Sequence, residues 1–425
     1  MTFNIIETFS GIGSQAKAFA KLKNKFPKLD YNVVATVEWE VGAMYSYDII
    51  HQGPQNLKRY SNWSKDDLLD NLIQLNLSFD GKNSMAKNSI KRLPLHALKA
   101  IKCSIDNNNN LIDISNVHAE DLPTADLLTY SFPCQDLSIS SYWHRNFSGI
   151  DKDAQNRSGL LWEIERILAE YHISGKQKPR FLLMENVSAI HSPMHIQNFN
   201  LWLKELEEFG YINFQFDLNS SNFGVPQTRV RTFMISVLAE DLTQLQLENI
   251  SSHFNNPNIF KMNKKTNLNS FLRLDYSNLI YRKEAIQSIP NKTPSRDKIR
   301  ADSIVLATGE KPENIVARTI TTKQDRNPNA GIIIHEIADI ESGKSEYRNL
   351  TSREAFLLMG FEEEDYQALI DNNLQLTKSR TLLSNAKLLK LAGNSIVVNI
   401  LEEIFREILY VNDTIIKPHS KQNAI

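Results

Sequence analysis

Short apolar runs alternate with amphipathic stretches through the first half of the chain. Four short runs are apolar, which predicts strands at 3–8, 32–37, 125–130 and 180–184. Residues 15–22 and 159–171 instead repeat apolar side chains with the period of a helix. Two later runs, 214–218 and 232–238, are further strand candidates. Strands that alternate with helices predict an α/β fold, in which a parallel sheet carries helices on both faces.

The pattern changes after residue 248, which predicts a second domain. Residues 249–348 are rich in Asn, Lys and Ser and contain no long amphipathic run, so we predict a smaller domain of irregular and β structure. Residues 352–359 and 397–409 are helical in pattern, so 349–412 should return to the first domain, 1–248. Residues from about 46 to 111 form an Asn- and Lys-rich insertion, whose pattern does not indicate a role. Residues 413–425 should be a loose tail.

Composition indicates an ordinary water-soluble protein. The chain has 425 residues, of which 41% are hydrophobic and 23% charged, which suffices for two domains. No apolar run is long enough to cross a bilayer, and the N-terminus lacks a basic segment followed by an apolar one. The two cysteines, Cys103 and Cys134, are too few for a disulfide framework or a Cys-rich zinc site. We therefore expect a cytoplasmic protein with no membrane partner and no metal.

Charge is informative only where it is concentrated. The net charge of −1 does not suggest a nucleic-acid partner. Residues 257–300, however, contain ten Lys or Arg and three Asp or Glu, a local charge of +7 (10 − 3). A local basic face is what the neutralisation of phosphates requires. A solvated surface explains the same charge equally well.

A glycine turn directly follows the first predicted strand. Gly11 and Gly13 stand between that strand and a helix, where they would let the backbone approach a ligand closely. Glu38 and Trp39 end the second strand, where an acid can bind ribose hydroxyls and an indole can lie against an adenine ring. The alternative is an ordinary turn, a surface Glu and a partly buried Trp.

Three more predicted strands carry, at or near one end, residues suited to chemistry. Cys134 follows the apolar run 125–128 in the sequence TYSFPCQ, although a lone cysteine is more often a small buried apolar residue. Glu185 follows the next apolar strand and could donate a proton to a ring nitrogen, or be a surface turn acid. Arg229 and Arg231 alternate along a strand, so both should point to one face, toward carbonyl or phosphate oxygens or simply toward solvent. Near the C-terminus, a Gly-Asn-Ser turn should cap an amphipathic helix.

The order of these segments is more specific than any one of them. FSGIG at 9–13, PCQ at 133–135, ENV at 185–187, QTRVR at 227–231 and GNSIVV at 393–398 form an ordered series. In this series the chain resembles the DNA cytosine-5 methyltransferase family, of the bacterial restriction–modification type. The resemblance covers most of the chain outside 46–111 and 249–345.

The resemblance implies a role for each matched residue. The residues implied in catalysis are Cys134 as nucleophile, Glu185, Arg229 and Arg231. Those implied in binding S-adenosylmethionine are Phe9, Gly11, Gly13, Glu38, Trp39, Asp113, Ile114, Leu160 and Asn394. Those expected to contact DNA are Gln135, Ser140, Trp143, Arg145, Arg318 and Thr319. Residues 136–157 would form a lid over the flipped base, and 249–348 would be the target-recognition domain.

The implied fold is a Rossmann-like methyltransferase domain with a smaller, irregular and β target-recognition domain. The implied activity is site-specific methylation of carbon 5 of a flipped-out cytosine in double-stranded DNA, through a covalent adduct on Cys134. We expect a monomer that protects DNA in a restriction–modification system, whose endonuclease would be encoded elsewhere. The chain departs from the family pattern at Glu362, where a proline is usual.

Three rival functions explain part of the sequence. A tRNA methyltransferase of the same superfamily would share all five motifs, but it normally lacks a large recognition domain. An NAD-dependent dehydrogenase would use the glycine turn and Glu38 and leave PCQ and ENV without a role. A DNA-binding protein without activity would explain the basic segment and nothing else.

Overall fold

The computed structural model describes residues 2–133, 157–338 and 340–417. The chain divides into two compact units. The larger unit consists of Met1–Leu218, Val230–Lys261 and Leu401–Ile425, and the smaller unit of Asn219–Arg229 and Met262–Ile400. Among the described residues, no helix is both long and apolar enough to cross a membrane.

The larger unit is built on a six-stranded sheet. Its strands are β1 (Phe3–Thr8), β2 (Tyr31–Val37), β3 (Leu127–Tyr130), β4 (Phe181–Val187), β5 (Tyr211–Asn219) and β6 (Val230–Leu238), in the order β2-β1-β3-β4-β6-β5. The pairs β1/β2, β1/β3 and β3/β4 are parallel, whereas β6 runs antiparallel to β4. The predicted strands are therefore confirmed, but the sheet is mixed rather than wholly parallel.

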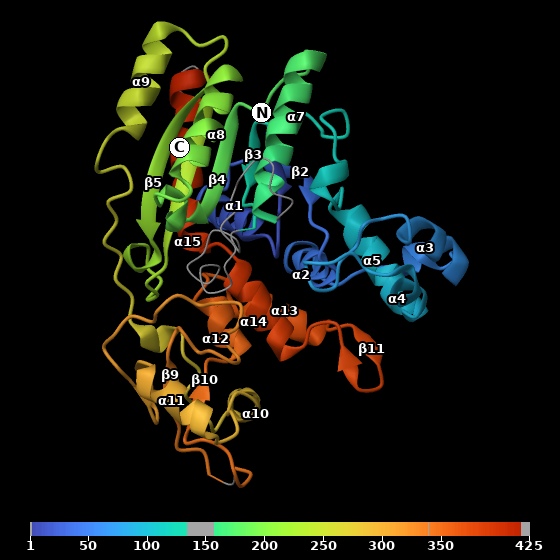
Figure 1. Ribbon diagram of the computed structural model, residues 1–425, viewed down its shortest axis with the longest axis vertical. Helices are drawn as coiled ribbons and strands as arrows, with labels where there is room; N and C mark the ends of the chain where they lie inside the picture. Colours follow the sequence, from blue (N-terminus) through green and yellow to red (C-terminus); the bar gives the residue numbers. More distant parts are fainter. Residues whose placement is uncertain (1, 134–156, 339, 418–425) are drawn as a thin grey trace. The chain divides into compact units, whose positions relative to one another are not determined.

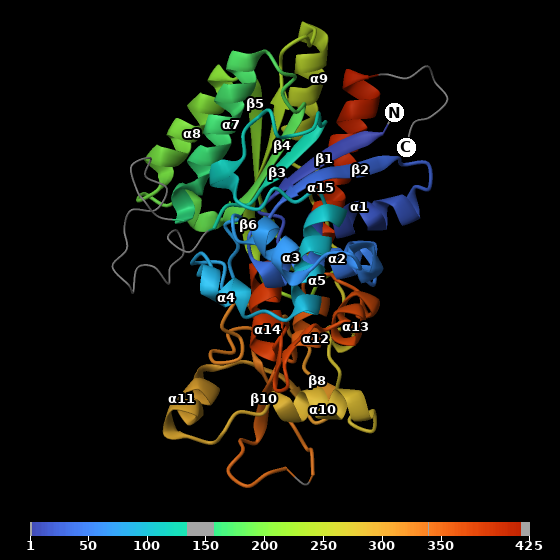
Figure 2. The same cartoon turned by 90° about the vertical axis from the view of Figure 1, so that its right-hand side faces the viewer.

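Helices cover both faces of this sheet, as the alternating pattern predicted. The helices are α1 (Ser14–Lys25), α7 (Leu161–Ser174), α8 (Ile196–Glu208), α9 (Gln244–Phe254) and α15 (Val398–Tyr410). On one face Phe19 of α1 stacks on Phe405 of α15, with ring centroids 4.2 Å apart. On the other face α7 and α8 bury Trp162 and Trp202 in one apolar cluster with β3 and β4. Figure 2 shows α7 and α8 on one side of the sheet and α1 and α15 on the other.

The insertion after β2 is a small helical element. It begins with α2 (Val41–Gln52) and continues through a 3-10 turn (Leu57–Tyr60), α3 (Lys65–Leu72), α4 (Lys87–Lys91) and α5 (Leu95–Asn107). The buried face of α5 carries Ala97, Leu98 and Ile101, and this helix packs on α2 and α3. In Figure 1 α3 and α4 extend beyond α5, away from the sheet.

The smaller unit has its own sheet and helices. Its strands are β7 (Val305–Thr308), β8 (Lys311–Pro312), β9 (Ile332–Ile334) and β10 (Tyr347–Asn349), in the order β10-β9-β7-β8, together with the hairpin β11 (Gln375–Thr377) and β12 (Arg380–Thr381). Its helices are α10 (Leu279–Gln287), α11 (Pro294–Asp302), α12 (Ser352–Leu357), α13 (Glu363–Asp371) and α14 (Asn385–Asn394). The helices α10 and α11, of nine residues each, were not predicted for this irregular and β region.

Buried charge organises the smaller unit. Arg348 and Glu354 are both fully buried, and two guanidinium nitrogens of Arg348 donate to the two carboxylate oxygens of Glu354 at 2.8 Å. The same carboxylate accepts hydrogen bonds from the backbone N–H groups of Arg273 and Thr351, each at 2.8 Å. Glu354 therefore joins the start of α12 to a distant loop as well as to β10.

Candidate active site

The glycine turn after β1 has an unusual backbone. Phe9, Gly11 and Gly13 all have positive φ, at 53°, 56° and 80°. A Cβ on Gly13 would lie 2.2 Å from Nε2 of His51, so only glycine fits there. A Cβ on Gly11 would meet no atom of the described residues within 4 Å, so among them this glycine leaves open space beside the backbone. The absent side chain of Gly11 therefore lets a ligand approach the backbone closely.

Two titratable groups, the fully buried Glu7 and the half-buried His51, lie beneath this turn. Burial lowers the pKa of His51 to about 4, so its ring is neutral at pH 7. Its Nε2 lies 3.1 Å from the carbonyl oxygen of Ile12 and donates to it. Burial raises the pKa of Glu7 to about 8, against a smaller lowering effect of the Tyr47 side chain. Glu7 is thus a neutral acid at pH 7, and the turn rests on uncharged groups.

The acid predicted to bind ribose is already held against the turn. One carboxylate oxygen of Glu38 accepts from the N–H of Gly11 at 3.0 Å, and the other accepts from the N–H of Glu40 at 2.8 Å. Because β1 and β2 are parallel neighbours, their carboxyl ends lie together, which brings the two segments into contact. Trp39, next to this acid, is half-buried.

Asn110 supports Glu38, a role that sequence reasoning missed. Its side-chain amide accepts from the N–H of Glu38 and donates to the carbonyl of Glu38, both at 3.0 Å. It also accepts from the N–H of Ile112, whose φ of 67° is rare for a β-branched residue. Asn110 lies in a run of four asparagines, where no pattern distinguishes it from a loop residue.

The predicted adenine-binding residues lie just beyond this point. Asp113 accepts from the N–H of Ser115 at 3.1 Å and also binds the side chain of Asn76. Ile114 is buried in the apolar cluster of the α7 face, and Phe9 and Leu160 pack against the same cluster. The fold thus brings three predicted cofactor residues, which are distant in sequence, to one apolar surface.

Cys134 lies outside the described residues, together with Gln135, Ser140, Trp143 and Arg145. The described chain reaches Pro133, three residues after the end of β3, which lies between β1 and β4. The buried side chain of Asn186, in the ENV segment, donates to the carbonyl of Phe132 at 3.2 Å. ENV therefore holds the backbone that leads to the predicted nucleophile.

Glu185 and Arg231 lie side by side. They come from the antiparallel strands β4 and β6, and Nε of Arg231 is 3.4 Å from a carboxylate oxygen of Glu185. Both side chains are largely buried, with 16% and 11% of their surfaces exposed. In such a place the guanidinium fixes the position of the carboxyl group.

Arg229 does not share a strand face with Arg231, so that prediction was wrong. It precedes β6, which begins at Val230, and its guanidinium is buried in the smaller unit. There it donates to the carbonyls of Ile320, Gly393 and Ser395, at 3.0, 3.2 and 2.9 Å. These three bonds tie the QTR segment to the GNS segment and to Ile320, which directly follows Thr319.

The GNS segment also differs from its prediction. Gly393 and Asn394 are the last residues of α14 rather than a turn, and the Ser395 hydroxyl donates to the carbonyl of Leu391 in the same helix. A Cβ on Gly393 would lie 2.6 Å from the backbone of Thr321, so this glycine permits close packing. Asn394 itself is exposed.

Arg318 and Thr319 lie on a firmly held backbone in the smaller unit. The N–H of Arg318 donates to Ala330, and the hydroxyl of Thr319 donates to the carbonyl of Thr228 at 2.7 Å. The buried side chain of Gln227 accepts from the N–H of Ile320 at 2.9 Å. The side chain of Arg318 is exposed, which leaves it available to a partner.

The chain is similar to known proteins over nearly its whole length. A family model described as C-5 cytosine-specific DNA methylase matches residues 67–410. Type II methyltransferase M2.ScrFI of Lactococcus lactis subsp. cremoris is 31% identical over 407 residues, which cover 95% of this chain and 98% of that protein. Orphan methyltransferase M.SssI of Spiroplasma monobiae is 32% identical over 410 residues, covering 95% and 96%.

Solved structures share the fold. The crystal structure of S. pombe Dnmt2 methyltransferase matches with a TM-score of 0.55 and 17% identity, over 96% of this chain and 98% of that one. The Entamoeba histolytica methyltransferase EhMeth matches with a TM-score of 0.53 and 14% identity, over 96% and 98%. The predicted Rossmann-like fold class is confirmed.

Proposed function

Since this chain belongs to the family of C-5 cytosine-specific DNA methylases, and so is a DNA cytosine-5 methyltransferase, we propose that Cys134 forms a covalent adduct with a cytosine flipped out of duplex DNA. The observation that carries the proposal is the order of strands β2, β1, β3 and β4 in one sheet. At the carboxyl ends of these neighbours stand Glu38, the glycine turn, Pro133, which directly precedes Cys134 in the sequence, and Glu185. Ligands of open parallel sheets bind at this edge.

The residues after β1 and β2 suit S-adenosylmethionine, which supplies an electrophilic methyl group on its sulfonium sulfur when bound. The open space beside Gly11 allows a close approach to the backbone. The Glu38 carboxylate would accept hydrogen bonds from the ribose hydroxyls, and its position is already fixed by two N–H groups. Trp39, Ile114 and Leu160 would surround the adenine with apolar surface. We assign Phe9, Gly13, Asp113 and Asn394 to the same ligand.

The covalent step overcomes the low reactivity of carbon 5 of cytosine. The Cys134 thiolate adds to carbon 6, and the ring electrons that this addition releases make carbon 5 a nucleophile. Carbon 5 takes the methyl group, then loses its proton to a solvent base, and the thiolate leaves carbon 6 as the ring double bond re-forms. Every bond made to Cys134 is thus broken again, and the enzyme is regenerated.

Glu185 would stabilise the ring during this step. A protonated carboxyl group that donates to ring nitrogen 3 would offset the negative charge that thiolate addition brings, and its other oxygen would accept from the exocyclic amine. The neighbouring guanidinium of Arg231 would hold the carboxyl group in place. Arg229 would act through the backbone it organises, as a positioning residue.

Recognition of the DNA site is assigned to 249–348, with Arg318 and Thr319 as base-reading candidates. The loop 136–157, with Gln135, Ser140, Trp143 and Arg145 in or beside it, would close on the flipped base and fill its gap. Flipping costs a few kcal/mol, which such contacts must repay. By analogy with relatives named type II methyltransferases, we propose that methylation protects DNA in a restriction–modification system.

The decisive experiment compares two cysteine variants of the full chain. Cys134→Ser should abolish methyl transfer from labelled S-adenosylmethionine to DNA and keep cofactor binding. Cys103→Ser is the matched control, because Cys103 is buried in α5 and has no part in the mechanism. Duplex DNA containing 5-fluorocytosine should trap the wild type as a denaturation-resistant adduct, since fluorine cannot leave as a cation. Full activity of Cys134→Ser would exclude the covalent step, and transfer to tRNA in place of DNA would exclude the assigned substrate.

A further inference from the structure

The helical insertion contains a dense cationic segment that the mechanism does not use. Between Asp80 and Asp106 the chain has no acidic residue. The same stretch contains six Lys or Arg, namely Lys82, Lys87, Lys91, Arg92, Lys99 and Lys102. A charge of +6 over 25 residues is a stronger local concentration than that of the predicted recognition region.

The fold turns most of these cations outward. Ile90 and Leu93 are buried and anchor the α4 region, while four cations are exposed, namely Lys82, Lys87, Lys91 and Arg92. Lys99 is half-buried on α5. Lys102 differs from the others, because it pairs with Asp106 at 2.5 Å and lies against the ring of Trp63. The cationic face is therefore defined as Lys82, Lys87, Lys91, Arg92 and Lys99.

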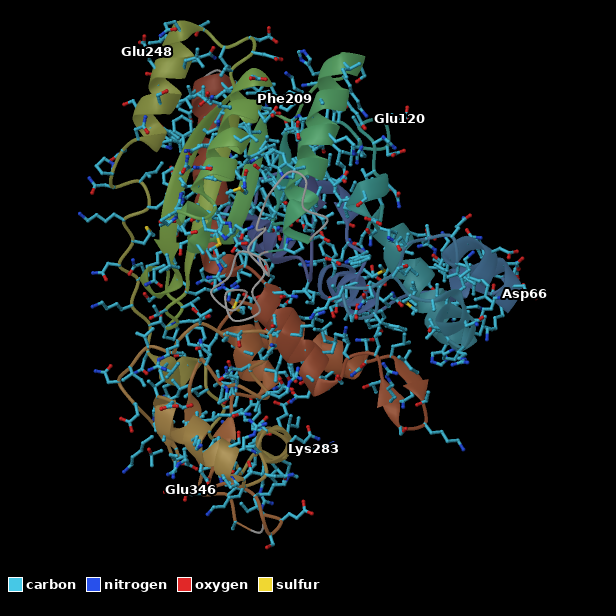
Figure 3. All side chains as sticks on the ribbon, viewed as in Figure 1. Asp66, Glu120, Phe209, Glu248, Lys283 and Glu346 are labelled. Atoms are coloured by element: carbon cyan, nitrogen blue, oxygen red, sulfur yellow. The ribbon has the colours of Figure 1, made fainter. Side chains whose placement is uncertain are left out.

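Charge in the insertion is segregated rather than mixed. Helix α3 carries three acids, Asp66, Asp67 and Asp70, against one lysine, Lys65, and Figure 3 shows Asp66 at the outer end of the element. A solvated surface that served only solubility would intersperse the two signs. An acidic helix beside a cationic face instead favours binding of a polyanion in one orientation.

The insertion is fixed near the carboxyl ends of the strands of the large sheet, where the candidate active site lies. It begins three residues after Glu38, and it ends at Asn110, whose side chain binds the backbone of Glu38. Within it, the buried carboxylate of Asp48 accepts from Gln55 at 2.7 Å and from Asn108 at 2.9 Å, which fastens α2 to the end of α5. The cationic face is therefore a rigid part of the larger unit.

We propose that the cationic face is a second DNA-binding surface, which holds the phosphate backbone of duplex DNA outside the target-recognition region. This inference rests on the proposed function, because it takes duplex DNA as the substrate. Side chains that contact phosphates raise affinity for every sequence alike and do not choose the target base. The surface therefore sets how strongly the enzyme holds DNA, and not which cytosine it methylates.

The test is the salt dependence of DNA binding by the full chain. Each phosphate contact adds about 0.9 to the slope of log affinity against log salt. Lys91→Gln combined with Arg92→Gln should lower the slope by up to about 1.8, so that wild type loses about tenfold more affinity than the variant between 50 and 200 mM salt. KM for DNA should rise at a fixed salt concentration, while kcat at saturating DNA stays unchanged.

The matched control removes the same charge elsewhere in the larger unit. Lys28 precedes the amino end of β2, whereas the insertion follows the carboxyl end of that strand. Lys204 lies on α8, and both lysines are exposed. Lys28→Gln with Lys204→Gln should leave the slope as in wild type. The proposal is overturned if the two double variants have the same slope, or if kcat falls and KM does not change. A wild-type protein that neither binds nor methylates DNA would instead refute the proposed function.

Discussion

At the residue scale, Glu7 is the clearest case of a side chain whose charge is set by the fold. Its carboxyl group has no exposed surface, and burial raises its pKa from 4.5 to about 8. The unfolded chain ionises this acid above pH 4.5, while the folded chain keeps it neutral. The stability that Glu7 contributes is therefore complete below its unfolded pKa and is lost as pH rises through 8.

The pH window for testing Glu7 follows from its neighbours. His51 has a lowered pKa of about 4, so its own effect on stability is complete above pH 6.5. Tyr31 and Tyr47, which also face Glu7, have raised pKa values and stay neutral in this range. The melting temperature of the wild type should fall between pH 6.5 and 8, and Glu7→Gln should remove this fall. At pH 8 the variant should therefore unfold at a temperature several degrees higher than the wild type. If the melting temperatures of the two proteins change with pH in the same way across that window, the raised pKa of Glu7 is contradicted.

At the residue scale, the sequence predicts the place of a side chain best where local pattern sets it, although the predicted roles of these residues stay predictions. The glycines of the turn and Glu38 were found from their places after strands, and the structure brings them into contact. Asn110 and His51 could not be found in this way. Each acts on a residue far away in sequence, and a buried histidine or an asparagine in a polar run gives no local sign of its partner.

At the element scale, the buried pair of Arg348 and Glu354 joins β10 to the start of α12. Removing one partner leaves the other charge buried and unpaired. Glu354→Gln should therefore cost about 3–5 kcal/mol of the free energy of unfolding, measured in urea. Glu364→Gln, on the first turn of α13, is the control and should cost less than about 1 kcal/mol. A cost for Glu354→Gln as small as that of the control would show that the pair contributes little.

Element-scale prediction was accurate for strands and poor for the last motifs. The strand β1 has the predicted bounds, because a buried strand after a short N-terminus is a continuous apolar run. The GNS segment was misread, because a glycine before two polar residues is typical of a turn. In the structure Gly393 serves the packing of α14 against Thr321, which is a tertiary contact that no local pattern encodes.

At the scale of the whole molecule, the two compact units suggest a division of labour in DNA binding. The sequence indicated a separate second region from its change of composition, and the helices α10 and α11 escaped prediction because their short apolar faces give a weak periodic signal. The cationic face belongs to the larger unit and would act on any sequence. Arg318 belongs to the smaller unit, where its backbone is held and its side chain is exposed. A fixed backbone with a free guanidinium suits the reading of base edges, because misplacement would cost specificity.

Arg318→Ala should consequently change which cytosines are methylated. A guanidinium that reads a base contributes about 1–3 kcal/mol of discrimination, so the preference for the best site over its single-base variants should fall by about 5- to 150-fold. Sequencing methylated cytosines in DNA from cells that express each variant measures this directly. Lys311→Ala, on the exposed strand β8 of the same unit, should leave the preference unchanged. If Arg318→Ala lowers methylation equally at all sites, the residue contacts phosphate, and base reading must be sought elsewhere in 249–348.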